Sequence, residues 1–362
     1  MPSTSVSEES IGTSSEIKEQ YQKFIGRKVI FILSLPPLLF LICAISASLG
    51  SAPITIGDAS AAFLHKFFPS YFDPSRLAER VVWFMRLPRI FMGVAAGIGL
   101  GIAGSVMQGV LKNPLASPYT LGIASGAGFG AALALTLGVG LVEGKYLIIG
   151  NAFLFALICS FIIVGLVSYK DATPETMILA GIAMMYFFSA MTTLLQYIAG
   201  PMATAAVVFW LIGDLGESSW GELSLITIVF VCCIPLLLWK SWDLNVMGAG
   251  DETAKSLGVN VERVRIFMMI AASLLVAGIV CFTGTIGFIG LVAPHITRMA
   301  IGGDNRFLLP ASGLVGAVIL VGADTVARMV IAPVIIPVGV MTAFLGVPLF
   351  FYLIMRRRKR YW

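Results

Sequence analysis

The residues that come nearest to a catalytic motif are 249–256, AGDETAKS, because they end in the Lys-Ser pair of a phosphate-binding loop. Such a loop, GxxxxGK[ST], needs glycines so that backbone N–H groups can approach the phosphates. Ala249 and Ala254 occupy both glycine positions here. The segment therefore predicts no nucleotide site, and any energy for work by this chain must come from elsewhere.

Ionisable groups that could bind a coupling ion are also missing from the middle of the apolar runs. Asp324 lies toward the end of one run, and the others contain no central Asp, Glu, Lys or Arg. Ion-coupled carriers usually need an intramembrane carboxylate or an equivalent group. The pattern disfavours such a carrier without excluding one, because some sodium carriers bind their ion through backbone and hydroxyl oxygens.

The elements that must position these residues are predicted to be membrane-spanning helices. Of the 362 residues, 58% are hydrophobic and 12% are charged, against about 25% charged in soluble domains. Uncharged runs of about twenty residues match a hydrocarbon core of about 30 Å. Nine such runs occur, at 29–49, 90–111, 119–141, 145–168, 176–199, 222–239, 264–283, 307–327 and 334–355. With the shorter run 286–297 as a tilted or partly buried span, the prediction is an all-α integral membrane protein of about ten spans, with nine as the alternative.

Lysine and arginine in the connections predict the orientation. The basic C-terminus at 356–360 and the Arg27-Lys28 pair before the first span place both termini in the cytoplasm. The loop 50–88 is then outside although it is basic, and lipid phosphate or plain solubility explains Arg76 and Arg80. The net charge of +5 fits a protein that contacts membrane lipid, and no nucleic-acid partner is needed to explain it.

Outside the spans, the chain divides into tails and one polar loop. Residues 1–28 are Ser- and Glu-rich and are predicted to be a disordered cytoplasmic tail; they are not a secretory signal, because the first apolar run starts late and is too long. Residues 29–355 form one membrane domain, and 356–362 form a basic cytoplasmic tail. Residues 240–263 predict two short helices with a break at 257–259, which suits a docking site for a soluble partner and a solvated connector equally well.

Small residues recur at helical spacing. In the second span the small residues are each four apart, and the third span has a similar face; the positions are Gly93, Gly97, Gly101, Ser105 and Gly109, then Gly122, Gly126 and Gly130. Such faces let helix backbones approach closely in a membrane. We expect a packing role for them and a dense bundle of helices. The five cysteines (Cys43, Cys159, Cys232, Cys233 and Cys281) lie in apolar runs and predict neither disulfides nor a metal site.

A weak internal repeat is present. RIFM at 89–92 followed by Ala-Ala recurs as RIFM at 265–268 followed by Ala-Ala, and the same offset aligns Leu115 with Leu291. In the predicted topology the copies, spans 2–5 and 7–10, are inverted. Inverted repeats place the pathway of many transporters at their interface.

A set of motifs spread over about residues 50–355 resembles the permease subunits of bacterial importers for iron chelates (siderophores, haem) and cobalamin. These importers are driven by a separate ATP-binding-cassette (ABC) protein. The motifs are RLPR at 86–89, Gly104 to Gln108 with KNPLA at 112–116, Leu121 to Gly126, Gly250-Asp251 through Val259, GTIGFIGLVAPH at 284–295, Leu309-Pro310, Ala323-Asp324 to Arg328, and Pro337-Val338-Gly339 through Leu345-Gly346-Val347-Pro348. The long N-terminal tail departs from the family pattern.

The resemblance implies partners and site residues. The permease domain 29–355 would form a dimer, homodimeric by preference, around a central path. Two ATPase subunits, which hold the ATP and Mg, would lie below it, and a periplasmic or lipid-anchored binding protein above it. The chain itself would bind no cofactor or metal. The implied docking residues for the binding protein are Arg86, Arg89 and Arg328, whose guanidinium groups suit carboxylates. The implied ATPase-coupling residues, within cytoplasmic helices at 250–263, are Gly250, Asp251, Glu252, Lys255, Leu257 and Gly258. The cytoplasmic gate is Asn113 and Leu115, and the path is Gln196, Met202, Thr204, Phe209 and Trp210.

The sequence thus predicts a bacterial inner-membrane permease that is not itself an enzyme. Ferric siderophore leads as the substrate, followed by haem and cobalamin. The two histidines are assigned bland roles: His65 as a surface residue, and His295 as a structural or ATPase-facing residue rather than a haem ligand. An ion-coupled secondary carrier or a channel is the alternative function.

Overall fold

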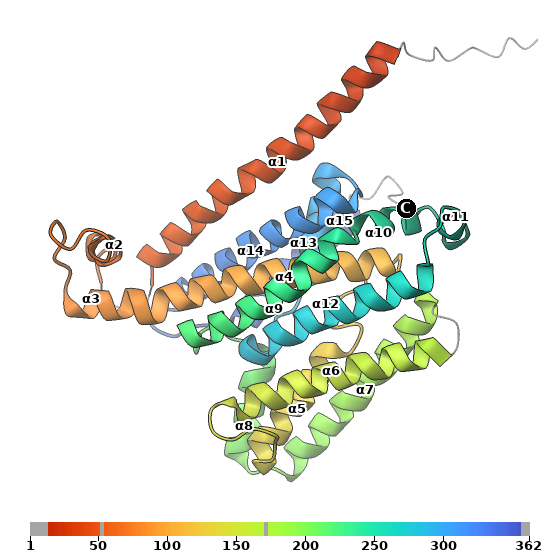
Figure 1. Cartoon of the computed structure of the whole chain (residues 1–362). Coiled ribbons are helices and arrows are strands. Elements are labelled where there is room, and N and C mark those ends of the chain that lie inside the picture. Colours follow the sequence, from red (N-terminus) through yellow and green to blue (C-terminus); the bar gives the residue numbers. More distant parts are fainter. Residues whose placement is uncertain (1–13, 51–53, 170–172, 356–362) are drawn as a thin grey trace, which may run out of the picture.

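The computed structural model describes residues 14–50, 54–169 and 173–355, and the regular elements of this part are fifteen α-helices and one π-helix (Figure 1). Their bounds are α1 (Ser14–Ser48), α2 (Ile56–His65), α3 (Arg76–Val81), η1 (Val82–Arg86), α4 (Leu87–Val110), α5 (Ile123–Leu137), α6 (Tyr146–Tyr169), α7 (Pro174–Ile198), α8 (Pro201–Ile212), α9 (Trp220–Trp239), α10 (Ser241–Gly248), α11 (Asp251–Ser256), α12 (Val261–Thr283), α13 (Ile289–Ile301), α14 (Asn305–Met329) and α15 (Val338–Met355).

Seven helical segments in this part of the chain are long and apolar enough to cross a membrane, so the protein is a multi-pass membrane protein. They are Ile25–Ser48, the continuous helix Arg76–Val110, Tyr146–Leu166, Pro174–Ile198, Trp220–Trp239, Val261–Thr283 and Asn305–Met329. Seven of the ten predicted spans therefore correspond to full-length helices. The other three, over 119–141, 286–297 and 334–355, correspond to the shorter apolar helices α5, α13 and α15; of these, 286–297 was predicted to be short, and the other two were predicted to be full-length.

The shortness of α5 has a local cause. Gly122 (φ +71°) precedes the helix and Gly138 (φ +65°) follows it, both in the left-handed conformation that glycine adopts readily. These two residues limit α5 to 15 residues, although the uncharged run is longer.

The first helix begins earlier than predicted. Residues 14–28 are helical rather than disordered, because α1 starts at Ser14 and continues unbroken into the apolar run. Glu, Lys and Gln in this segment are good helix formers, and an existing helix is extended at little cost. The remaining parts of the two predicted tails, 1–13 and 356–362, lie outside the described residues.

Helix α4 forms the centre of the molecule. In the most apolar 18-residue stretch of the continuous helix Arg76–Val110, 78% of the residues are buried, against 11% in the corresponding stretch of α1. Helices α12 and α14 pack along α4. The predicted small-residue faces are confirmed in their central parts, whereas Gly122 precedes α5 and is not part of its face. A Cβ atom on Gly97 would lie 2.6 Å from the backbone N of Ala317 in α14 and closer still to its Cα, and one on Gly126 would lie 2.7 Å from Phe155 O in α6. The backbones of these helix pairs are therefore in direct contact.

Helices α4 and α12 run in opposite directions (Figure 1). α4 begins beside α3 at one end of the bundle, whereas α12 begins beside α11 at the other end. We refer to these as the α2–α3 end and the α10–α11 end. α5 to α8 form a second group of helices, which joins the first through contacts between α6 and α12.

Candidate functional site

A buried charge cluster lies at the α2–α3 end. Asp324 in α14 accepts hydrogen bonds from Arg89 in α4, at 2.9 Å from Nε and 2.8 Å from Nη2 to Oδ1. Arg328, one turn further along α14, donates from Nε to Asp324 Oδ2 at 3.1 Å. The side chains of all three are less than 10% exposed. Arg89 Nη2 also lies 3.3 Å from Oδ1 of the half-exposed Asp214, in the α8–α9 loop.

Arg86 and Arg328 also form hydrogen bonds to the end of α1 and the residue after it. Arg86 in η1 donates from Nη1 to Ala47 O at 2.7 Å and to Ser48 O at 3.1 Å. Arg328 donates to Ser46 Oγ at 2.5 Å and to Leu49 O at 3.1 Å. The three arginines predicted to dock a binding protein are thus brought together, but they are buried and already bonded within the chain.

The α10–α11 end carries two short helices within 240–263, as predicted. The break between them lies at Ala249 and Gly250, however, and the predicted break at 257–259 separates α11 from α12 instead. Gly250 (φ +120°) and Gly258 (φ +84°) stand on either side of α11 and have backbone conformations that favour glycine. Glu252 and Lys255 form an exposed pair on α11, with Nζ 2.9 Å from Oε1, and Leu257 is 69% exposed.

Asp251 has a different environment from its neighbours on α11. It accepts from Lys112 Nζ at 2.7 Å and from Arg265 Nη2 at 2.9 Å. Burial opposes its ionisation, but the hydrogen bonds from Lys112 and Arg265 outweigh burial and hold the pKa of Asp251 below its usual value. Asp251 is therefore ionised at neutral pH.

The predicted gate residues lie in a tight loop directly after α4. The Asn113 side chain accepts a hydrogen bond from Leu115 N at 2.9 Å, and Ala116 N donates to Asn113 O at 3.1 Å. Leu115 is 52% exposed. The loop presents this apolar side chain at its surface, which is compatible with a steric gate.

The predicted path residues lie around the junction of α7 and α8. Thr204 Oγ1 donates to Gln196 O at 3.2 Å, which ties the start of α8 to the end of α7. Met202 and Phe209 are 89% and 68% exposed, and Trp210 is half-buried. These side chains form part of an apolar surface.

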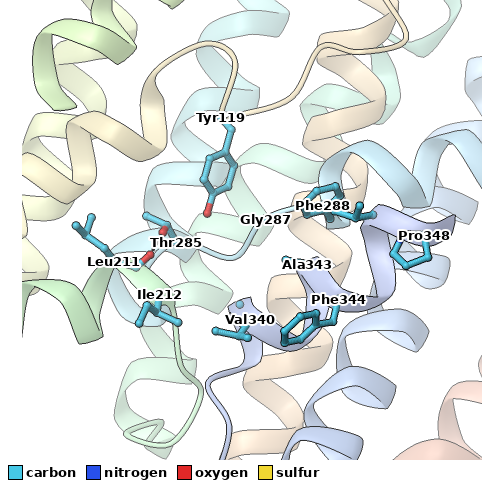
Figure 2. A pocket seen from close by; sticks show the side chains of 12 residues that line it. Tyr119, Leu211, Ile212, Thr285, Gly287, Phe288, Val340, Ala343, Phe344 and Pro348 are labelled. Atoms are coloured by element: carbon cyan, nitrogen blue, oxygen red, sulfur yellow. Dashed lines mark hydrogen bonds between the residues drawn. The ribbon is translucent and has the colours of Figure 1, made fainter. Parts of the chain in front are cut away.

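A cavity with a volume of about 670 Å³ lies at the end of α8 and is mostly apolar. It lies between the end of α8, the 285–288 segment and the first half of α15, and Figure 2 shows the Tyr119 hydroxyl pointing toward Thr285 at one side. Its lining residues are Tyr119, Leu211, Ile212, Thr285, Gly287, Phe288, Gly339, Val340, Ala343, Phe344, Val347 and Pro348. No charged side chain lines it.

None of the five predicted path residues lines this cavity, although Phe209 and Trp210 directly precede Leu211 and Ile212. The signal that could have located it was present in the sequence. Two of the motifs, GTIGFIG at 284–290 and the stretch 337–348, supply most of the lining, but sequence alone does not reveal that they meet.

No group of three or more His, Cys, Asp or Glu side chains that could hold a metal ion occurs among residues 14–50, 54–169 and 173–355. His295 lies in α13 and is half-buried. The sites described above are an apolar cavity and two clusters of ion pairs.

The comparison with family models decides the identity of the chain. The model of the FecCD transport family matches residues 38–356. The chain belongs to this family. FecCD proteins are the permeases of ABC importers for iron chelates, haem and cobalamin. Such a permease subunit is not itself an enzyme, and it works with an ATPase and a binding protein.

Two relatives and one solved structure agree with this assignment. An ABC transporter permease protein of Methanocaldococcus jannaschii is 44% identical over 95% of this chain and 99% of its own length. The hemin transport system permease of Yersinia pestis is 36% identical over 85% of this chain and 93% of its own length. An inward-facing structure of a transporter assigned to the metal-chelate ABC type matches with a TM-score of 0.79 and 32% identity, and it covers 90% of this chain and 99% of that chain.

The match to the archaeal relative also bears on the N-terminal segment. It leaves 5% of this chain unmatched, which is fewer residues than the 28 of the predicted tail. Part of that segment therefore has a counterpart in a relative, in keeping with its helical structure.

Proposed function

We propose that this FecCD permease moves a large metal chelate across a prokaryotic plasma membrane, with ferric siderophore as the leading substrate and haem or cobalamin next. The observation that carries the substrate class is the cavity beside α8 and α15. Its volume, about 670 Å³, lies within the range of small-molecule sites. Its walls are apolar and aromatic with two hydroxyl groups, which suits a ligand that shields its metal inside an organic shell.

The path is proposed to be completed by a second copy of the chain. The elements around the cavity expose large apolar side chains, among them Met202, Phe209 and Phe344. A homodimer with these elements at its axis would cover them and enclose the cavity. The opposite directions of α4 and α12 support the inverted repeat of spans 2–5 and 7–10, and the short helices α5, α13 and α15 would complete ten crossings together with their adjoining loops.

Energy is proposed to enter at the α10–α11 end, which we assign to the cytoplasm together with both termini. The exposed residues Glu252, Lys255 and Leu257, on the segment bounded by Gly250 and Gly258, offer charge and apolar contact to an ATPase subunit. Two ATPase copies would contact the two protomers. The loop that contains Asn113 and Leu115 would act as the inner gate. It lies at the same end of the molecule as α11, since Lys112 in this loop forms an ion pair with Asp251.

The binding protein is proposed to dock at the α2–α3 end. Because Arg89 and Arg328 are bonded to Asp324, and Arg86 to the end of α1, docking would require carboxylates of the binding protein to exchange with these partners. The half-exposed Asp214 is the partner that would be displaced most easily.

The test is ATP hydrolysis and chelate uptake by the full complex in proteoliposomes, with the cognate binding protein loaded in turn with a ferric siderophore, haem or cobalamin. Uptake together with stimulated hydrolysis for one of these ligands is expected. Stimulation by none of the three chelates, in a complex that hydrolyses ATP, would contradict the proposed substrate class.

A further inference from the structure

Three charged residues from separate parts of the α10–α11 end form one ion-pair bridge, Lys112–Asp251–Arg265. Lys112 Nζ lies 2.7 Å from Oδ1 of Asp251, and Arg265 Nη2 lies 2.9 Å from Oδ2. Each carboxylate oxygen therefore has its own cation. The bridge links the loop after α4, the helix α11 and the start of α12.

The Arg265 side of the bridge is fixed to the body of the protein. The Arg265 side chain is 4% exposed, and it lies in the second turn of α12, which packs against α4. Ala254, one turn after Asp251 in α11, is fully buried. A movement of α11 carries Asp251 with it, and must therefore either displace Lys112 or stretch the bonds of Asp251 to the two cations.

The Lys112 side of the bridge is continuous with the predicted gate. Lys112 has φ +49°, a left-handed conformation that is costly for a lysine and persists only where neighbouring contacts hold it. Asn113 N donates to Gln108 O at 3.2 Å, and the Asn113 side chain accepts from Leu115 N. Residues 113–115 are thus one hydrogen-bonded turn that follows Lys112 directly and is tied to the end of α4. A displacement of Lys112 therefore acts on this turn at Asn113.

Glu252 and Lys255 provide an internal comparison. They are on the same helix, but they pair with each other at the surface, where their side chains are 89% and 61% exposed. Asp251 is the acidic residue of α11 that faces the loop rather than the solvent. Asp251 therefore contacts the predicted gate loop, whereas Glu252 is available to a partner protein.

We propose that Asp251 is a positioning residue that transmits movements of α11 to the 112–115 loop through Lys112, with Arg265 as the fixed counter-charge. This inference rests on the proposed function, because it needs an ATPase that moves α11. In thermodynamic terms the bridge couples the state of α11 to the state of the gate, and each must then bias the other.

The test compares variants of the complete complex in proteoliposomes, with chelate transported per ATP hydrolysed as the readout. We expect Lys112→Met and Asp251→Asn each to lower this ratio at least about fivefold, the lower end of typical coupling between sites. The double variant should lose no more than either single variant, because both remove the same link. Lys112→Arg, which keeps the charge, should retain most of the ratio.

The matched control is the Lys240–Asp243 pair at the same end of the molecule. Its ions are 2.8 Å apart and its side chains are 28% and 23% exposed, against 28% and 33% for Lys112 and Asp251. Lys240→Met and Asp243→Asn should leave the ratio unchanged. Effects of the Lys112 and Asp251 substitutions that multiply in the double variant, or a loss in Lys112→Arg as large as in Lys112→Met, would overturn the proposal. If the unmodified complex shows no ATP-driven uptake, the proposed function fails instead.

Discussion

Replacing Asp324 by asparagine should destabilise the protein far more than the same change at Asp214, although both carboxylates bind Arg89. Asp324 is 3% exposed and faces two guanidinium groups. Its neutralisation leaves Arg89 and Arg328, 8% and 5% exposed, without their shared carboxylate. Breaking a buried pair in this way costs about 3–5 kcal/mol. Asp214 is 45% exposed and makes one longer contact of 3.3 Å to Arg89, so its loss should cost about 1 kcal/mol or less.

The assay is equilibrium unfolding of the purified protein in mixed detergent micelles, with the two asparagine variants measured beside the unmodified chain. Asparagine keeps the shape of each side chain, so the difference between the variants reports the buried charge. Equal losses for the two variants would refute the inference that the arginines depend on Asp324. A loss below about 1 kcal/mol in Asp324→Asn would refute it as well, because it would match an exposed pair.

Three further outcomes are expected. Gly97→Ala should lower the free energy of unfolding by about 1–3 kcal/mol, because its new Cβ would clash with the backbone of Gly316 and Ala317 in α14. Gly322→Ala, with no atom within 4 Å, should instead raise it by about 0.5–1 kcal/mol, and the same unfolding assay compares the two. Burial opposes ionisation of Asp304, but hydrogen bonds from Arg306 and Asn245 outweigh burial and lower the pKa of Asp304 to about 2. The stability that ionised Asp304 contributes should therefore be fully present above its ordinary pKa of 3.8 and be lost as the pH falls toward 2. Melting temperatures of the unmodified chain and of Asp304→Asn, measured against pH, report this contribution. Leu115→Ala should change stability by no more than about 0.5 kcal/mol, since the side chain is 52% exposed, yet should raise ATP-independent leak of chelate from loaded proteoliposomes.

The elements that depend on local pattern were predicted well. Apolar runs located α6, α7, α9, α12 and α14 to within a few residues, because the hydrocarbon core sets both the length and the composition of a span. The four-residue spacing of Gly97 and Gly101 identified the face of α4 that packs on α14. The polar stretch over 240–263 predicted two short helices, but it placed the break between them at 257–259, whereas α10 and α11 are separated at Ala249 and Gly250.

The features that depend on distant partners were not predicted. The hydrogen bonds of Arg89 to Asp214 and Asp324 join residues that are 125 and 235 positions apart in the sequence. No local sequence pattern reveals that these two carboxylates bind the guanidinium group of Arg89. Asp251 was predicted as an ATPase-facing charge like Glu252, whereas its contacts are to Lys112 and Arg265. The helical start of α1 was missed because composition alone favoured disorder, while helix already formed in the apolar run extends into residues 14–28.

The central claim is that transport by this chain is driven by a separate ATPase, and one uptake measurement tests it most directly. Proteoliposomes with the permease, its ATPase and external loaded binding protein are filled with ATP, and they are compared with proteoliposomes that contain the permease alone under an imposed proton or sodium gradient. Uptake of labelled chelate only in the first set, and its loss when ATP is replaced by a non-hydrolysable analogue, is the predicted result. Gradient-driven uptake by the permease alone would contradict the account.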